Sequence, residues 1–186
     1  MEGPRPARLP NGTRVRVITV SDGVVAGVRE DRSGEALAAR MAEMGAEVSR
    51  SIVPDEATLI AAEIVGAASE HAIILTTGGT GLTPRDVTPQ ATRSVLAYEI
   101  PGLAEAMRAA GRQSTPLADL SRAVVGVVGR ALVVNLPGSP GAATESLAAI
   151  ESVLAHAIET LAGPHDHDAA RRAGSVAYDR GEESAS

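Results

Sequence analysis

The sequence lacks cysteine, lysine, phenylalanine and tryptophan, and each absence excludes a class of structure or chemistry. Without cysteine, the chain forms no disulfide, offers no thiolate nucleophile and has no cysteine-ligated metal site. Without lysine, it can form no Schiff base and carries no Walker A motif, whose lysine contacts phosphates. Without Phe and Trp, the core of these 186 residues has to consist of valine, leucine, isoleucine and alanine.

Positive charge is carried by one residue type only. All 17 basic residues are arginine, and the formal net charge is −6. An acidic balance disfavours non-specific binding to nucleic acid or to a membrane surface, so we expect neither partner. A phosphate site therefore has to be local, and has to use arginine, backbone N–H groups, hydroxyl groups or a metal ion.

Long apolar runs are absent too. No stretch approaches the length of a transmembrane helix. The N-terminal segment MEGPRPARLPNGTR contains no apolar region of the kind that a secretory signal needs. We therefore expect a cytoplasmic protein.

Short apolar runs alternate with segments of helical periodicity, which is typical of an α/β fold. Runs at 14–20, 46–53 and 72–75 predict strands of a mainly parallel sheet. The runs 123–128 and 131–135 flank Gly129-Arg130 and predict a hairpin. Together these patterns predict a three-layer α/β/α sandwich with a mostly parallel sheet and an antiparallel edge hairpin.

Polar residues and prolines mark the expected helix starts. Ser33 is expected to cap a helix that Gly45 ends, and Thr88 is expected to cap a helix with Pro89 at its first position. A helix from Pro54-Asp55-Glu56 to about Ser69 lies between them, and later starts are expected at Pro101, Pro116 and Pro140. One long helical stripe is expected over Leu147, Ile150, Leu154, Ile158 and Leu161.

Composition divides the chain into three parts. Residues 14–163 are predicted to form the domain, between a flexible segment, 1–13, and a disordered tail, 164–186. The tail holds His165-Asp166-His167-Asp168, which we interpret as solvated rather than metal-binding. His71 and His156 have no partner visible in the sequence and are expected to be structural.

Residues 75–89, LTTGGTGLTPRDVTP, place three glycines and several hydroxyl groups directly after an apolar run. One interpretation is a tight turn that binds nothing. The interleaved hydroxyls favour the other, an anion nest in which successive N–H groups converge on phosphate oxygens. The loop matches neither GxxxxGK[ST] nor a GxGxxG in the first βα unit, so the two familiar phosphate loops are unsupported.

Ligands of open parallel sheets bind beyond the carboxyl ends of the strands. This rule brings the segments SDG, PDE, TTGGTG and NLPGSP into one neighbourhood. Asp22 with Ser21, Asp55 and Asp86 each have a capping or turn role as the plain alternative, worth about 1 kcal/mol for a helix cap. Beside phosphates, these carboxylates could instead hold Mg²⁺ or an N–H-rich ring, and Ser139 could help to hold an anion at a helix N-terminus.

With these residues assembled, the chain resembles the molybdopterin adenylyltransferase family, the Mog/MoaB-type proteins of molybdenum cofactor synthesis. The matching segments run in the expected order over roughly residues 14–162. They are VSDG, the PDE turn, LTTGGTGLTPRDVTPQAT, EIPGLAEAMR, LSRAVVGV and NLPGSPGA. One departure is Gln90, where many relatives carry an acidic residue.

The resemblance implies a molybdopterin-binding fold, usually trimeric, that joins molybdopterin to ATP with Mg²⁺. The products would be adenylylated molybdopterin and pyrophosphate, and a molybdate-inserting partner enzyme would use the former. Asp55 and Asp86 would be catalytic and would be the candidates for binding Mg²⁺. The ligand-binding residues would be Thr77, Gly78, Gly79, Thr80 and Gly81 on the nucleotide side and Pro137, Gly138 and Ser139 on the pterin side.

Three other functions stay open at this point. A carrier or scaffold of the same fold would bind molybdopterin without catalysis. A small kinase or phosphatase is disfavoured by the absence of lysine and cysteine. A purely structural subunit would leave the glycine loop unexplained.

Overall fold

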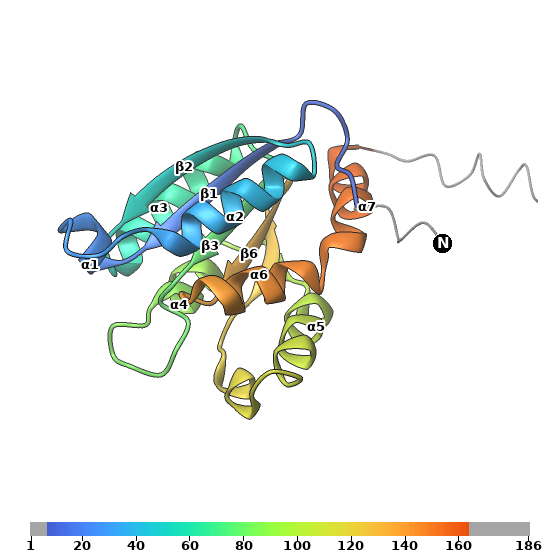
Figure 1. Cartoon of the computed structure of the whole chain (residues 1–186). Coiled ribbons are helices and arrows are strands. Elements are labelled where there is room, and N and C mark those ends of the chain that lie inside the picture. The colour runs from blue at the N-terminus through green and yellow to red at the C-terminus, as the bar shows by residue number, and fades with distance from the viewer. Residues whose placement is uncertain (1–6, 164–186) are drawn as a thin grey trace, which may run out of the picture.

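The computed structural model describes residues 7–163 (Figure 1). Residues 1–6 of the predicted flexible segment, and the whole predicted tail with its His-Asp-His-Asp sequence, lie outside the described residues. Within the described part, Leu9 is buried, and its N–H donates to the carbonyl of Met44 at 3.0 Å. Among these residues, no helix is both long and apolar enough to cross a lipid bilayer.

Six strands form one mixed sheet in the order β2-β1-β3-β6-β5-β4. Neighbours from β2 to β6 pair in parallel, β5 is antiparallel to β6, and β4 is antiparallel to β5. The predicted sandwich with an antiparallel edge hairpin is thereby confirmed. The strands are β1 (Arg14–Val20), β2 (Glu47–Val53), β3 (Ile73–Thr77), β4 (Tyr98–Glu99), β5 (Val125–Val128) and β6 (Ala131–Leu136).

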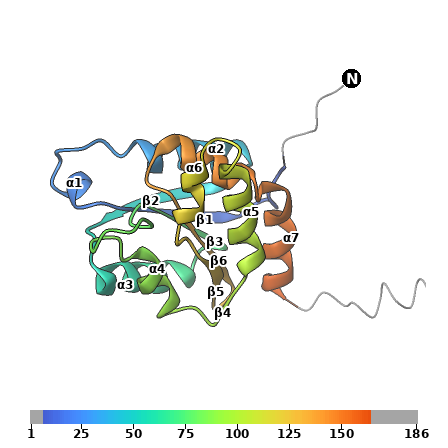
Figure 2. The ribbon, with the colours of Figure 1, turned by 90° about the horizontal axis from the view of Figure 1, so that it is seen from below.

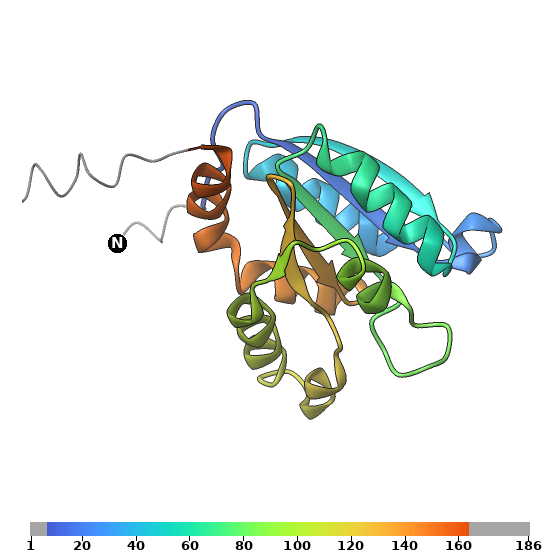
Figure 3. The same ribbon diagram turned by 180° about the vertical axis from the view of Figure 1, so that it is seen from behind.

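Helices cover both faces of the sheet, as Figure 2 shows, with α3 and α4 on one side and α2 and α6 on the other. Figure 3 shows α3 and α4 from the front. The helices are α1 (Asp22–Val25), α2 (Arg32–Glu43), α3 (Ala57–Ala68), α4 (Thr88–Arg93), α5 (Pro101–Gly111), α6 (Pro140–Ala148) and α7 (Glu151–Ala162), with the 3-10 helix η1 (Pro116–Leu120) after α5.

The side chains of the central strands alternate between two apolar clusters. On β1, Val15 and Val17 pack into the cluster under α2, α5, α6 and α7, while Ile18 and Val20 pack into the cluster under α3 and α4. Because successive residues of a strand point to opposite faces, a strand covered on both sides is apolar at most positions, as residues 73–75 of β3 are. This is the physical reason for the unbroken runs in the sequence.

A polar exception lies in the middle of the sheet. Asn135 on β6 is fully buried and donates through Nδ2 to the hydroxyls of Thr76 and Thr92, each at 2.9 Å. Its Oδ1 accepts the N–H of Val124 at 3.4 Å. This network ties β6, β3 and α4 together directly below the glycine loop.

Two expected caps are wrong. The cap of α2 is Asp31, which accepts the N–H of Gly34 at 3.0 Å, whereas Ser33 lies within the helix. The cap of α4 is Val87, and Thr88 is the first helical residue. The Thr88 hydroxyl instead donates to the carbonyl of Gly78, so a tertiary contact takes the place of a local cap.

The expected long C-terminal helix is two helices. α6 ends at Ala148 and α7 begins at Glu151, with Ile150 between them as the N-cap residue of α7 at φ −119°. Ile150 nevertheless remains buried with Leu147 and Leu154. The apolar spacing continues across the break, which is why periodicity alone did not reveal it.

Candidate active site

An open cleft of about 940 Å³ lies at the carboxyl ends of the parallel strands. Eight of the residues singled out in the sequence line it, as the rule for open sheets predicts. They are Ser21, Asp55, Thr77, Gly78, Gly79, Asp86, Gly138 and Ser139. The other loop residues, Thr80, Gly81 and Pro137, line an adjoining, mostly apolar hollow of about 250 Å³.

The glycines of the loop allow backbones to approach one another closely. A Cβ on Gly78 would lie 2.4 Å from the carbonyl oxygen of Val20, and a Cβ on Gly79 would lie 2.3 Å from the Thr88 hydroxyl. Both glycines also have positive φ, at 100° and 63°, which other residues adopt only at a cost. The loop is therefore wedged between the end of β1 and the start of α4.

Hydrogen bonds fix the start of the loop and use part of its donors. The N–H of Gly78 donates to Leu136 at 3.2 Å, and the N–H of Thr88 returns to the carbonyl of Gly79 at 3.1 Å. The N–H groups of Gly79 and Thr80 lie outside the helices and strands. Among the described residues, they donate to no backbone carbonyl. Fewer loop N–H groups are therefore left to bind an anion than the sequence suggested.

The carboxylate of Asp86 accepts hydrogen bonds from its own loop. Its Oδ2 accepts the backbone N–H and the hydroxyl of Thr83, at 2.8 and 2.6 Å. Burial by itself would raise the pKa of the Asp86 carboxyl, but the bonds from Thr83, the backbone of Gly81 and the charge of Arg122 together lower it. Asp86 is therefore an ionised carboxylate at neutral pH.

Asp22 and Asp55 exchange hydrogen bonds across two strand ends. The N–H of Asp22 donates to Asp55 Oδ2 at 2.9 Å, and the N–H of Asp55 donates to Asp22 Oδ1 at 3.0 Å. Arg85, next to Asp86, pairs with Asp22. The bond from the Asp55 backbone is the main cause that lowers the pKa of the Asp22 carboxyl; desolvation opposes it, and Arg85 adds to it. Asp55 therefore joins strand ends and is not the cap of α3, which is Glu56.

The two serines cap helices at the cleft. Ser21 accepts the N–H of Val24 at 3.3 Å and Ser139 accepts the N–H of Ala142 at 3.2 Å. Among residues 7–163 neither hydroxyl donates a hydrogen bond, so its proton can point to a ligand oxygen. The plain capping role and the ligand-binding role are therefore compatible.

Sequence reasoning missed a buried carboxylate at the far side of the cleft. Asp31 accepts the hydroxyl of Thr19 at 2.8 Å and pairs with Arg50 at 2.5 Å. A Cβ on Gly34 would lie 2.4 Å from the Asp31 carboxylate. The available signal was an aspartate directly before a helix, because Asp is among the residues preferred at the N-cap.

The carboxylates suit Mg²⁺ only if substrate phosphates and water supply the other ligands of the ion. Among the described residues, no group of three His, Asp or Glu side chains could enclose a metal ion. Mg²⁺ is usually bound by one or two carboxylates together with substrate phosphates and water. Asp86 and Asp55 each use Oδ2 within the protein, so their Oδ1 atoms fit such a partial donor set.

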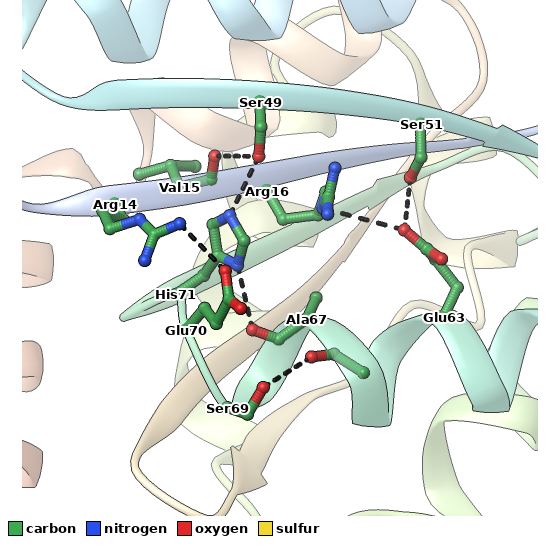
Figure 4. Close-up of polar contacts among 11 residues, drawn as sticks. Arg14, Val15, Arg16, Ser49, Ser51, Glu63, Ala67, Ser69, Glu70 and His71 are labelled. Carbon is green, nitrogen blue, oxygen red and sulfur yellow. Dashed lines mark hydrogen bonds and ion pairs between the residues drawn. The ribbon is translucent and has the colours of Figure 1, made fainter.

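A second polar cluster lies on β1, β2 and α3 (Figure 4). The ring of His71 contacts the Ser49 hydroxyl and the carbonyl of Ala67, each at 2.9 Å. Arg16 lies 3.6 Å from Glu63 in the same cluster. Since none of these residues lines the cleft, the histidine has the structural surroundings expected of it.

Comparison with known proteins gives consistent relatives. Residues 16–156 match a family described as "Probable molybdopterin binding domain". The chain is 40% identical over 173 residues to the molybdenum cofactor biosynthesis bifunctional protein of Synechococcus elongatus, covering 88% of this chain and about half, 54%, of that protein. It is 36% identical over 158 residues to the molybdopterin adenylyltransferase of Escherichia coli K12, covering 80% of each.

Solved structures agree with this assignment. The MoaB protein of Thermus thermophilus is 47% identical with a TM-score of 0.75, over 82% of this chain and 98% of that one. The Mog protein of Mycobacterium ulcerans is 36% identical with a TM-score of 0.77, over 81% of this chain and 99% of that one.

Proposed function

Because this chain belongs to the family of probable molybdopterin binding domains, we propose that it transfers an adenylyl group from ATP to molybdopterin. The products are adenylylated molybdopterin and pyrophosphate. The names of its relatives support an enzyme of molybdenum cofactor biosynthesis. The observation that carries the finer proposal is the convergence of the glycine loop, Asp55 and Asp86 on one cleft.

The reaction needs positioning more than covalent chemistry. An oxygen of the molybdopterin phosphate attacks the α-phosphorus of ATP, and the bond from that phosphorus to the bridging oxygen breaks as pyrophosphate leaves. Holding the two phosphates in line makes the step effectively unimolecular. The amides of Gly79 and Thr80 and the hydroxyl of Ser139 are the donors that we assign to this task.

The carboxylates have the complementary role. Unaided, Asp55 and Asp86 would repel phosphate oxygens. When Mg²⁺ is bound, it supplies charge neutralisation for the phosphates. In our proposal, Asp55 and Asp86 orient that ion or the pterin, and Ser21 and Gly138 complete the wall of the cleft. Asp22 holds Asp55 through their paired hydrogen bonds, and Pro137 lines the adjoining hollow.

A turnover assay tests this assignment. The chain is mixed with molybdopterin, ATP and Mg²⁺, and pyrophosphate and the adenylylated product are measured. Asp86→Asn and Asp55→Asn should each lower kcat by about 10²-fold or more, the loss typical of a missing electrostatic contact. Glu70→Gln is the control, because Glu70 pairs with Arg14 away from the cleft.

The outcomes separate the candidates. Molybdopterin binding without pyrophosphate would support a carrier of the same fold instead. Wild-type turnover in both aspartate variants, with folding intact, would show that these carboxylates are not catalytic.

We also propose that the chain forms a homotrimer and that its product passes to a molybdate-inserting enzyme. Sedimentation equilibrium should then give three times the 18.9 kDa of one chain. A mass of one chain at micromolar concentration would contradict the trimer.

A further inference from the structure

Arg122 binds the back of the glycine loop at three points. It lies in the segment between η1 and β5, and its own N–H donates to the carbonyl of Thr80 at 3.1 Å. Its Nε donates to the carbonyl of Gly81 at 2.7 Å, and Nη2 donates to the carbonyl of Asp86. We call these three hydrogen bonds the Arg122 clamp.

The clamp determines which way the loop peptides face. In a trans peptide the C=O and N–H groups point in opposite directions. The carbonyls of Thr80, Gly81 and Asp86 point to Arg122, so the N–H groups that follow them point away from it. The Arg122 side chain therefore sets the orientation of the Gly81–Leu82 and Asp86–Val87 peptides, and its main-chain N–H sets that of the Thr80–Gly81 peptide.

The clamp also holds Asp86 from the side that Thr83 does not reach. Thr83 binds the carboxylate, whereas Arg122 binds the main-chain carbonyl of the same residue. The guanidinium spans the two ends of residues 81–86 and keeps that segment closed. Within residues 7–163, no carboxylate lies within 4.0 Å of it, so its hydrogen bonds go to the loop rather than to a salt bridge.

We propose that Arg122 is a positioning residue for adenylyl transfer, holding the glycine loop and Asp86 in the reactive arrangement without touching the substrates. This inference rests on the proposed function. A planar guanidinium can reach two carbonyls at once, whereas a lysine ammonium acts as a single point, so lysine should replace it only in part.

The test compares Arg122→Ala and Arg122→Lys with Arg130→Ala. Arg130 is the matched control, because it also donates to a main-chain carbonyl, that of Ala162 at 3.0 Å, but outside the cleft. Steady-state kcat and KM are measured for ATP and molybdopterin, together with hydrogen exchange of the amides of residues 78–88. Guanidinium chloride is then added to Arg122→Ala at a concentration well below that which unfolds it.

We expect Arg122→Ala to lower kcat by about 10²-fold, as displacements near 1 Å do, with a smaller change in either KM. Arg122→Lys should fall between Arg122→Ala and the wild type, and guanidinium should restore part of the lost kcat. The loop amides should exchange faster in Arg122→Ala. If Arg122→Ala fails to fold, the kcat and loop exchange of Arg122→Lys decide the matter.

Wild-type kcat in a folded Arg122 variant, or a loss that neither guanidinium nor lysine relieves, overturns the proposal. A wild-type chain that releases no pyrophosphate contradicts the proposed function instead. In that case hydrogen exchange of the loop amides alone decides whether Arg122 orders the loop. Unchanged amide exchange in Arg122→Ala would overturn that role too.

Discussion

At the scale of single residues, the aspartates at the strand ends have both a structural and a chemical role. Asp22 and Asp55 exchange backbone bonds, and Asp86 fills its own loop. A carboxylate that accepts backbone N–H groups is stabilised in its charged form. The contacts that lower the pKa of the Asp22 and Asp86 carboxyls therefore also hold the loops in place.

The first prediction concerns Asp22 and pH. Its pKa lies below the ordinary 3.8 in the folded chain, so its carboxylate stabilises the fold above about pH 4. That contribution is lost as the pH falls through the lower, folded pKa. The difference in unfolding midpoint between the wild type and Asp22→Asn should therefore be constant from pH 6 to 8 and shrink below pH 4, as urea unfolding can measure. A difference that stays constant down to pH 2 would contradict the assigned shift.

At the scale of elements, the glycine loop is held by β1, by α4 and by Arg122, and its remaining side faces the cleft. The end of β1 and the start of α4 leave no room for a Cβ, and Arg122 binds the back of the loop. Rigidity of this kind keeps donors in place before a ligand arrives, which reduces the ordering that binding would otherwise cost.

The second prediction separates close approach from backbone strain. Gly79 and Gly129 have nearly the same φ, 63° and 60°, but only a Cβ on Gly79 would meet a neighbour. Gly129→Ala should cost about 1 kcal/mol of unfolding free energy, the penalty for left-handed geometry. Gly79→Ala should cost about 1 kcal/mol more, and should also lower activity, because the Thr88 hydroxyl must move. Equal costs in urea unfolding would show that the loop yields easily.

At the scale of the whole molecule, the C-terminal helix completes the larger apolar cluster. Leu154 on α7 is fully buried against residues from distant parts of the chain. Glu151 of the same helix binds Arg40 of α2 through two hydrogen bonds, at 2.6 and 2.7 Å, and this contact raises the pKa of Arg40. The helix thus links the first part of the fold to the last.

The third prediction uses neighbouring residues of α7. Leu154→Ala should lower the unfolding free energy by about 2–5 kcal/mol, because it leaves a cavity in the core. Val153 is 43% exposed, and Val153→Ala should change the unfolding free energy by at most about 0.5 kcal/mol. Similar losses in thermal unfolding of the two variants would mean that α7 is not part of the cooperative core.

Eight of the 19 residues that line the candidate cleft followed from the sequence, but the partners of their side chains did not. The rule for open sheets brought SDG, PDE, TTGGTG and NLPGSP together correctly. The capping pattern assigned Thr88 to a helix cap, although that hydroxyl binds Gly78, and no sequence pattern gave a site role to Asp31 or Arg122. Local patterns report what a residue does to its own helix or turn, whereas these contacts join segments that are distant in sequence.

The amino-acid sequence by itself determined the class of the fold and the chemistry open to this chain. Apolar runs of strand length specify a sheet buried on both faces, and the absence of lysine and cysteine leaves amides, arginine and carboxylates for any phosphate site. Only the tertiary structure decided which amides stay unpaired, which carboxylates meet and which arginine holds the loop. Those choices depend on distances between strand ends, which packing sets and which no periodicity along the chain contains.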